Sequence, residues 1–185
     1  SEDGKILYTG EVKNGKRVGV WKTFFETGEL QEEGLYENDI YKIINARNIK
    51  GEQTVTDGNG EYISYWNEEA VNLVGNVKNG LKDGVWISYY VTGEILNETE
   101  YLNGKTNGMT RAYYNTGQFS FEGEFLNDLR QGDWIWYNED GTLSSTVTYK
   151  DDKKEGTQLF YDMSENLIKK EKYKNGELVK VEITN

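Results

Sequence analysis

Pairs of neighbouring carboxylates are the residues of this sequence with the most direct capacity for chemistry. They occur at Glu32-Glu33, Glu68-Glu69 and Asp151-Asp152. Two carboxyl groups that flank a sugar bond can act as the acid and the base of glycoside hydrolysis. Adjacent strand residues point to opposite faces, however, and 32 acidic residues make accidental pairs common. A glycosidase-like enzyme is therefore a remote alternative.

One acidic segment has the spacing of a metal site. Asp57-Gly-Asn59-Gly-Glu61, with Glu68 at the twelfth position from Asp57, is similar to an EF-hand calcium loop. Tyr62 occupies the position at which that loop needs Gly, and the flanking sequence has no helical periodicity. The segment also coincides with the turns of the repeat described below. We therefore interpret it as a turn, and we expect no metal and no other cofactor.

The overall composition argues against most catalytic and nucleic-acid-binding classes. The chain has no His and no Cys, which removes the commonest general base, the thiol nucleophile and the two best zinc ligands. Its formal net charge of −11 repels the phosphates of nucleic acids and the headgroups of anionic membranes. We expect a protein that is not an enzyme and that binds neither nucleic acid nor an anionic membrane surface.

A 24-residue repeat organises the chain. Gly60, Gly84, Gly108, Gly132 and Gly156 lie 24 residues apart, and a Tyr follows each of them by five positions. Apolar residues recur eleven and seventeen positions after each Gly, and we expect all three positions to be buried. The recurring apolar residues are Val71, Ile95, Phe119, Leu143 and Leu167, followed by Val77, Tyr101, Phe125, Tyr149 and Tyr173.

These units predict a single repeat domain over residues 1–185. A partial unit at 5–18 precedes six units that start near Gly19, Gly60, Gly84, Gly108, Gly132 and Gly156. The distance from Gly19 to Gly60 exceeds one period, so an insertion occupies about residues 40–59. Ser1 stands where a start Met would be expected, so we expect that a leader was removed from the chain.

Each unit has the pattern of a β-hairpin. Aromatic and β-branched segments alternate with turn signals such as Asn79-Gly80 and Asn103-Gly104. Two strands cannot bury a face alone, so neighbouring hairpins must pair edge to edge. We predict an all-β fold in which about twelve to fourteen strands form one elongated, twisted antiparallel sheet. The residues five and eleven positions after each Gly should share one face, opposite a second aromatic row.

The repeat resembles the bacterial MORN-variant repeat. The resemblance covers nearly the whole chain and rests on Asn79-Gly80, Gly84, Trp86, Tyr89, Tyr90, Gly93, Ile95 and Tyr101. Proteins with such arrays are often named YwqK-type antitoxins, so the resemblance implies a bacterial source, an interaction role and a toxin as one class of partner. The more familiar MORN repeat carries Gly-x-Gly after a Tyr-x-Gly start, and its role in membrane tethering needs basic patches that this sequence lacks. Both a cytoplasmic and an exported location stay open.

Five residues form the candidate interaction surface. Tyr41 and Arg47 lie in the insertion. We interpret it as an additional hairpin projecting from the sheet, as a harmless enlarged loop or as an atypical repeat that has lost its Gly. Trp66, Tyr90 and Tyr114 are expected to be exposed, because they fall on the less regular aromatic row. Such aromatic residues bind protein partners or stack on sugar rings, although packing between strands is the alternative for most of them.

These observations favour a non-enzymatic repeat scaffold for protein-protein interaction, with an unknown protein partner. A cell-envelope protein that binds glycans through the exposed aromatic row is the alternative. The two differ in what they require, because a scaffold depends on the insertion or the acidic surface whereas a glycan binder depends on the aromatic rings alone.

Overall fold

The computed structural model describes residues 6–184 and confirms the all-β prediction. Over these residues sixteen antiparallel strands form one open sheet whose strand order follows the sequence. Ser1 and the start of the partial unit at residue 5 lie outside the described residues. The strands are β1 (Tyr8–Lys13), β2 (Lys16–Phe24), β3 (Leu30–Glu37), β4 (Ile40–Arg47), β5 (Gln53–Thr56), β6 (Asn59–Tyr65), β7 (Val71–Lys78), β8 (Leu81–Tyr89), β9 (Ile95–Leu102), β10 (Lys105–Tyr113), β11 (Phe119–Leu126), β12 (Leu129–Tyr137), β13 (Leu143–Lys150), β14 (Lys153–Tyr161), β15 (Leu167–Lys174) and β16 (Glu177–Ile183).

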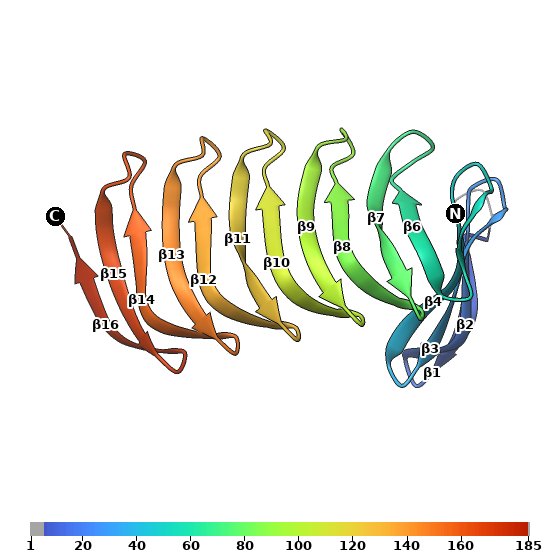
Figure 1. Cartoon of the computed structure of the whole chain (residues 1–185), viewed down its shortest axis with the longest axis horizontal. Helices are drawn as coiled ribbons and strands as arrows, with labels where there is room; N and C mark the ends of the chain where they lie inside the picture. Colours follow the sequence, from blue (N-terminus) through green and yellow to red (C-terminus); the bar gives the residue numbers. More distant parts are fainter. Residues whose placement is uncertain (1–5, 185) are drawn as a thin grey trace. The chain divides into compact units, whose positions relative to one another are not determined.

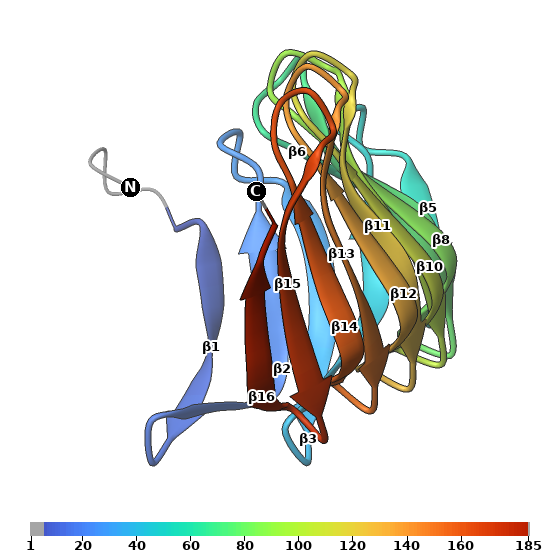
Figure 2. The ribbon, with the colours of Figure 1, turned by 90° about the vertical axis from the view of Figure 1, so that its left-hand side faces the viewer.

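The chain divides into two compact units, Ser1–Trp86 and Ile87–Asn185, which we describe separately. In the second unit β9 to β16 follow one another as consecutive hairpins with turns at both ends (Figure 1). Figure 2 shows that the strands of this unit, among them β12 to β15, curve along their length. Each 24-residue period is therefore one hairpin, as the repeat predicts.

The insertion is part of the sheet, so the prediction of a projecting hairpin was wrong. Its strands β4 and β5 pair with each other and with the neighbouring β3 and β6. The amide of Ile43 donates to the carbonyl of Gly80 over 2.8 Å, and the amide of Gly58 donates to the carbonyl of Ile44 over 2.7 Å. The insertion thus satisfies its backbone groups inside the first unit and adds two strands to the number that we predicted.

A bulge at the same place in five of the repeat hairpins sets which side chains share a face. In the second unit, Ala112 pairs with Phe121 but Tyr113 pairs with Phe119, so Ser120 is an additional residue in β11. The register shifts in the same way in four other hairpins, between the residues four and five positions after the repeat Gly. Such a bulge reverses the alternation of side chains beyond it.

The sheet consequently has two distinct faces. The tyrosine face carries the residues three, five, eleven, fourteen and sixteen positions after each Gly. The tryptophan face carries those two, four, thirteen, fifteen and seventeen positions after it. The ring of Tyr113 lies 5.1 Å from that of Phe119, which confirms that positions five and eleven share a face. The prediction that positions five, eleven and seventeen are all buried is only partly confirmed, because Phe119 is 39% exposed whereas Tyr149 belongs to the buried core.

The tryptophan face holds the buried core of each unit. In the second unit Trp134, Val147 and Tyr149 are buried and Phe121 packs on them. In the first unit Trp86 is 1% exposed and its indole donates to the carbonyl of Asn76 over 3.0 Å. Burial of each of these aromatic side chains removes roughly 150–250 Å² of surface from water.

Candidate functional site

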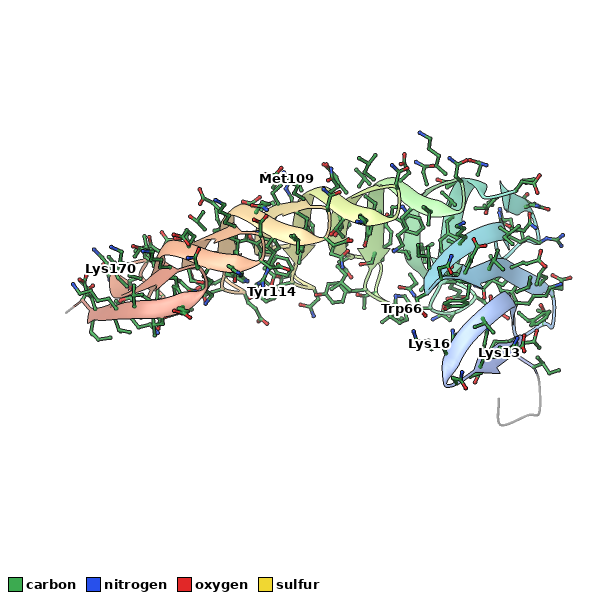
Figure 3. All side chains as sticks on the ribbon, turned by 90° about the horizontal axis from the view of Figure 1, so that it is seen from below. Lys13, Lys16, Trp66, Met109, Tyr114 and Lys170 are labelled. Carbon is green, nitrogen blue, oxygen red and sulfur yellow. The ribbon has the colours of Figure 1, made fainter. Side chains whose placement is uncertain are left out.

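The turns at one end of the first unit enclose a cavity of about 400 Å³. Phe24 and Tyr65 line it from the ends of β2 and β6. The β2–β3 turn contributes Phe25, the β4–β5 loop contributes Ile49, and the β6–β7 loop contributes Trp66. We call this cavity the loop-end cavity. Its aromatic lining includes Trp66, which is 52% exposed and is labelled in Figure 3. A concave apolar surface with an accessible Trp is typical of a binding site.

Polar side chains hold the loops around the cavity in place. The Asn67 side chain accepts hydrogen bonds from the amides of Glu69 and Ala70, each over 2.9 Å. Asn48 accepts in the same way from the amides of Lys50 and Glu52, each over 3.0 Å. Asn side chains that bind nearby amides replace the backbone bonds of a tight turn. Trp66 and Ile49 therefore extend from loops whose conformation is set locally.

The loop-end cavity is lined by carboxylates as well as by aromatic rings. Glu26, Glu29 and Glu68 lie among the described residues that line it, and none of those lining residues is Lys or Arg. Carboxylates beside exposed ring faces attract cations, because both the charge and the ring quadrupole favour positive charge. The cavity therefore suits an apolar group that ends in a positive charge.

A buried carboxylate with two phenols lies elsewhere in the first unit. Glu32 is 8% exposed and accepts a hydrogen bond from Tyr41. Burial and the neighbouring Glu32 carboxylate raise the pKa of both Tyr41 and Tyr62 well above the ordinary value. The phenols therefore stay protonated and act as hydrogen-bond donors to Glu32 at neutral pH. None of the cavities found in the described residues is lined by Glu32, Tyr41 or Tyr62. We therefore assign this cluster a role in stabilising the folded unit.

The two candidate residues of the insertion occupy different environments. The ring of Tyr41 lies over Gly34, at which an added Cβ would come within 2.3 Å of the Tyr41 ring carbon that carries the hydroxyl. Tyr41 thus belongs to the packed tryptophan face. Arg47 is exposed at the end of β4, where it pairs with Gln53. The structure does not bring either residue into the loop-end cavity, to which the insertion contributes Ile49.

Tyr90 and Tyr114 are joined to the next hairpin by the same hydrogen bond. The hydroxyl of Tyr90 donates to the carbonyl of Tyr113, and the hydroxyl of Tyr114 donates to the carbonyl of Tyr137, each over 2.8 Å. Each bond spans 23 residues, so it links position six of one repeat to position five of the next. The two rings are half-buried, and this role in holding hairpins together is the packing alternative that the sequence left open.

The paired carboxylates do not form acid-base pairs. Glu32 lies on the tryptophan face with Tyr41, whereas Glu33 lies on the tyrosine face, where hydrogen bonds from Asn45 and Lys22 lower its pKa. Asp151 accepts from Gln131 over 2.5 Å and Asp152 accepts from Arg130 over 2.8 Å. Each of these four carboxylates therefore has a separate hydrogen-bond partner. Among the residues that the structure describes, no group of three or more Asp, Glu, His or Cys could hold a metal ion.

Sequence reasoning missed most of the loop-end cavity. Phe24 and Phe25 lie in the unit that starts near Gly19, and Ile49 lies in the insertion, but about 40 residues separate Phe25 from Tyr65 and Trp66 in the sequence. Only the folding of the first unit brings Phe25 and Trp66 to one cavity. The exposed Trp66 was the one sequence signal that pointed to it.

In the described part of the chain no helix has the length and apolarity needed to cross a membrane.

Three stretches of the chain match the MORN repeat variant. They are residues 17–38, 82–103 and 130–151, and each spans one hairpin together with the turn residue after it. These are the hairpins in which Trp21, Trp86 and Trp134 stand two positions after the repeat Gly. The match to the MORN repeat variant therefore coincides with the tryptophans that form the core of each unit.

Comparisons beyond the MORN repeat variant add little. No curated protein matches the sequence. Among solved structures, a protein with unknown function from Bacteroides fragilis NCTC 9343 is similar at 12% identity, covering 99% of this chain and 95% of that chain, with a TM-score of 0.16. The TM-score is too low to carry an argument about fold or function.

Proposed function

We propose that this protein is a non-catalytic repeat scaffold that binds a protein partner at the loop-end cavity. The observation that carries the proposal is the combination of Trp66, half exposed, with Phe25 and Ile49 around a cavity of about 400 Å³. The MORN repeat variant supports a scaffold role, because repeat arrays present surfaces on a rigid framework of stacked hairpins.

The charge of the cavity defines the kind of partner that fits. Glu26, Glu29 and Glu68 surround the aromatic lining. An Arg or Lys side chain could lay its apolar stem on Phe25 and Trp66 and direct its charge toward these carboxylates. A cation over an aromatic ring contributes roughly 0.5–2 kcal/mol, and a partly buried carboxylate adds to this. The partner would therefore offer a basic residue that is flanked by apolar ones.

A toxin is one partner class within this proposal, because the repeat resembles that of YwqK-type antitoxins. Such a toxin would carry a basic, partly apolar segment that the scaffold covers. The net charge of −11 would speed the encounter with a basic partner by electrostatic steering. The same charge disfavours nucleic acid and anionic membranes as partners.

Selection of peptides from a random library tests the proposal. We expect peptides selected on the intact protein to contain a basic residue beside apolar ones, and to bind W66A at least about tenfold more weakly. V91A is the matched control, because Val91 is 58% exposed in a loop of the second unit and should leave binding unchanged. Selected peptides that bind W66A and the intact protein equally would overturn the proposal. A glycan array tests the alternative function of glycan binding. If the intact protein binds a sugar and W66A does not, the cavity would be assigned to a glycan.

A further inference from the structure

Two repeat positions on the tyrosine face of the second unit change charge from one hairpin to the next. Fourteen and sixteen positions after the repeat Gly stand Glu98 and Glu100 on β9, Glu122 and Glu124 on β11, Thr146 and Thr148 on β13, and Lys170 and Lys172 on β15. The register places the residues at position fourteen in one continuous row, whereas register shifts in β12 and β14 interrupt the row at position sixteen. Glu98 pairs with Arg111 on β10, which pairs with Glu122. The row continues through Ile135, Thr146 and Leu159 to Lys170.

Strand β13, which carries Thr at both of these positions, divides the acidic pairs of this face from the basic pair. β11 lies two strands from β13 on one side and β15 lies two strands from it on the other. The Glu pair of β11 and the Lys pair of β15 occupy the same two repeat positions, so each pair has the same spacing of roughly 7 Å along its strand. Figure 3 places Met109, which pairs with Glu124 on this face, on the side of the ribbon opposite to Tyr114.

We propose that the tyrosine face of β11–β15 binds the same face of a second copy of this chain. The two-fold axis lies between the two faces and runs parallel to β13. This operation places β11 of one copy over β15 of the other and keeps the rows aligned, so that Glu122 meets Lys170 and Glu124 meets Lys172 twice in each dimer. A two-fold interface requires a self-complementary surface, and an acidic and a basic pair placed symmetrically about one strand satisfy that requirement.

The apolar residues of the face obey the same symmetry. Ile135 on β12 and Leu159 on β14 both pair with Thr146, one on each side of it. The two-fold axis therefore brings Ile135 of one copy over Leu159 of the other. Both side chains are half-buried in the chain alone, so further burial against each other adds apolar contact to the ionic one.

The local contacts leave charge on both sides available for this pairing. Lys170, Lys172 and Lys180 line a hollow of about 460 Å³ with Glu182, and Glu182 forms its ion pair with Lys180. Three lysines thus share one carboxylate among the residues lining the hollow. Around β11, Arg111 lies 3.5 Å from Glu122 and is the counterpart of Glu98 as well, while Glu124 is exposed. On the strands next to β13, Asp133 accepts from Thr148 and Glu155 from the amide of Asn175. Both residues pair with Thr148, so the same axis brings Asp133 over Glu155 of the other copy, and this like-charge contact weakens the dimer.

A second copy fits this face better than an unrelated partner does. Two copies share one repeat geometry, so strand spacing and row spacing match without adjustment. The five strands β11 to β15 span only about 20 Å, which places the contact among small interfaces below roughly 1,200 Å². The net charge of −11 on each copy opposes association, so we expect a weak dimer that forms at high protein concentration.

Charge reversal tests the pairing between copies. We expect sedimentation equilibrium at concentrations up to about 1 mM to show dimers of the intact chain, with a dissociation constant in the range of weak complexes. K170E/K172E and E122K/E124K should each weaken self-association roughly tenfold or more, because each puts like charges opposite one another. A one-to-one mixture of the two variants should restore the dimer as a heterodimer, since every Glu then meets a Lys.

Several results would contradict the pairing. An intact chain that stays monomeric throughout this range overturns it, and so does a K170E/K172E variant that dimerises like the intact chain. Failure of the mixture to associate would do the same. Circular dichroism should show native strand content for each variant, and K170E/K172E alone decides the matter if E122K/E124K does not fold. The variant with all four changes should form homodimers again.

Discussion

The indole of Trp134 lies directly on the backbone of Gly123, its neighbour on the preceding strand. A Cβ built at Gly123 would come within 2.3 Å of the ring. The same relationship joins Trp86 to Gly75 and Trp21 to Gly10, and in each case the Trp stands eleven positions after the Gly. Each tryptophan hairpin of the MORN repeat variant therefore needs a Gly in the strand before it.

Substitution at this contact should show that the two positions act as a pair. We expect G123A to destabilise the second unit by about 1–3 kcal/mol, because the new methyl group displaces a ring that is tightly packed. In the neighbouring hairpins the equivalent positions hold Thr99 and Thr110, whose hydroxyls are 2.8 Å apart. The double variant G123T/W134T should therefore lose less stability in urea unfolding than the sum of G123T and W134T. Additive losses would show that the pairing is incidental.

The hydroxyls of Tyr90 and Tyr114 should contribute to stability. Removal of the hydrogen bond to the next hairpin, in Y90F or in Y114F, should each lower the free energy of unfolding by about 1 kcal/mol. The two effects should be similar, since both bonds are 2.8 Å long and link equivalent positions. Thermal unfolding followed by circular dichroism measures the difference. If Y114F is as stable as the intact chain, Tyr114 has no structural role of this kind and its ring is available as a contact residue.

The strands of the insertion should be essential to the first unit. Val55 on β5 is fully buried, with 0% exposure, so V55A should destabilise the unit by roughly 1–3 kcal/mol. V85A provides the control, because Val85 is 49% exposed and its truncation should change stability by less than about 0.5 kcal/mol. Chemical unfolding of both variants makes the comparison. Equal stability of V55A and V85A would mean that the insertion is a dispensable loop.

Alkaline pH should destabilise the fold through the buried phenols. Burial, together with Glu32, raises the pKa of Tyr41 and Tyr62 above the value of about 10 that an unfolded chain has. Above that pH the unfolded state loses protons that the folded state keeps, so the free energy of unfolding is unchanged below about pH 10 and falls as the pH rises further. Phenolate absorbance should show a step in which tyrosines ionise together with unfolding. Burial also raises the pKa of Tyr101, so in Y41F/Y62F this step should shrink by two tyrosines, and an unchanged step would exclude the assignment to these phenols.

The sequence was sufficient for the repeat, the turns and one face of the sheet. Asn79-Gly80 and Asn103-Gly104 have positive φ at both residues, as the hairpin-turn interpretation requires. Tyr113 and Phe119 share a face as predicted. The bulge at Ser120 could not be read from alternation, because one additional residue in each hairpin reverses the parity of the residues after it. The core was therefore assigned partly to the wrong positions.

The candidate site depended on contacts between loops, which a periodic pattern does not encode. Trp66 was identified as an exposed aromatic residue, but Phe25 and Ile49 reach the same cavity only through the way in which β4 and β5 join the sheet. Tyr41 was placed in the candidate interaction surface because aromatic residues are common at contacts. Its position over Gly34 instead makes it a substitute within the insertion for the core tryptophan of other hairpins.

Calorimetric titration of a selected basic peptide tests the binding role of the loop-end cavity most directly. The peptide and its counterpart with citrulline in place of Arg would each be titrated into the intact protein and into W66A. We predict that either change alone weakens binding at least about tenfold, and that the two losses together are smaller than their sum, because both remove the same contact. Losses that add fully, or a peptide whose affinity ignores both Trp66 and the charge of its Arg, would contradict the account.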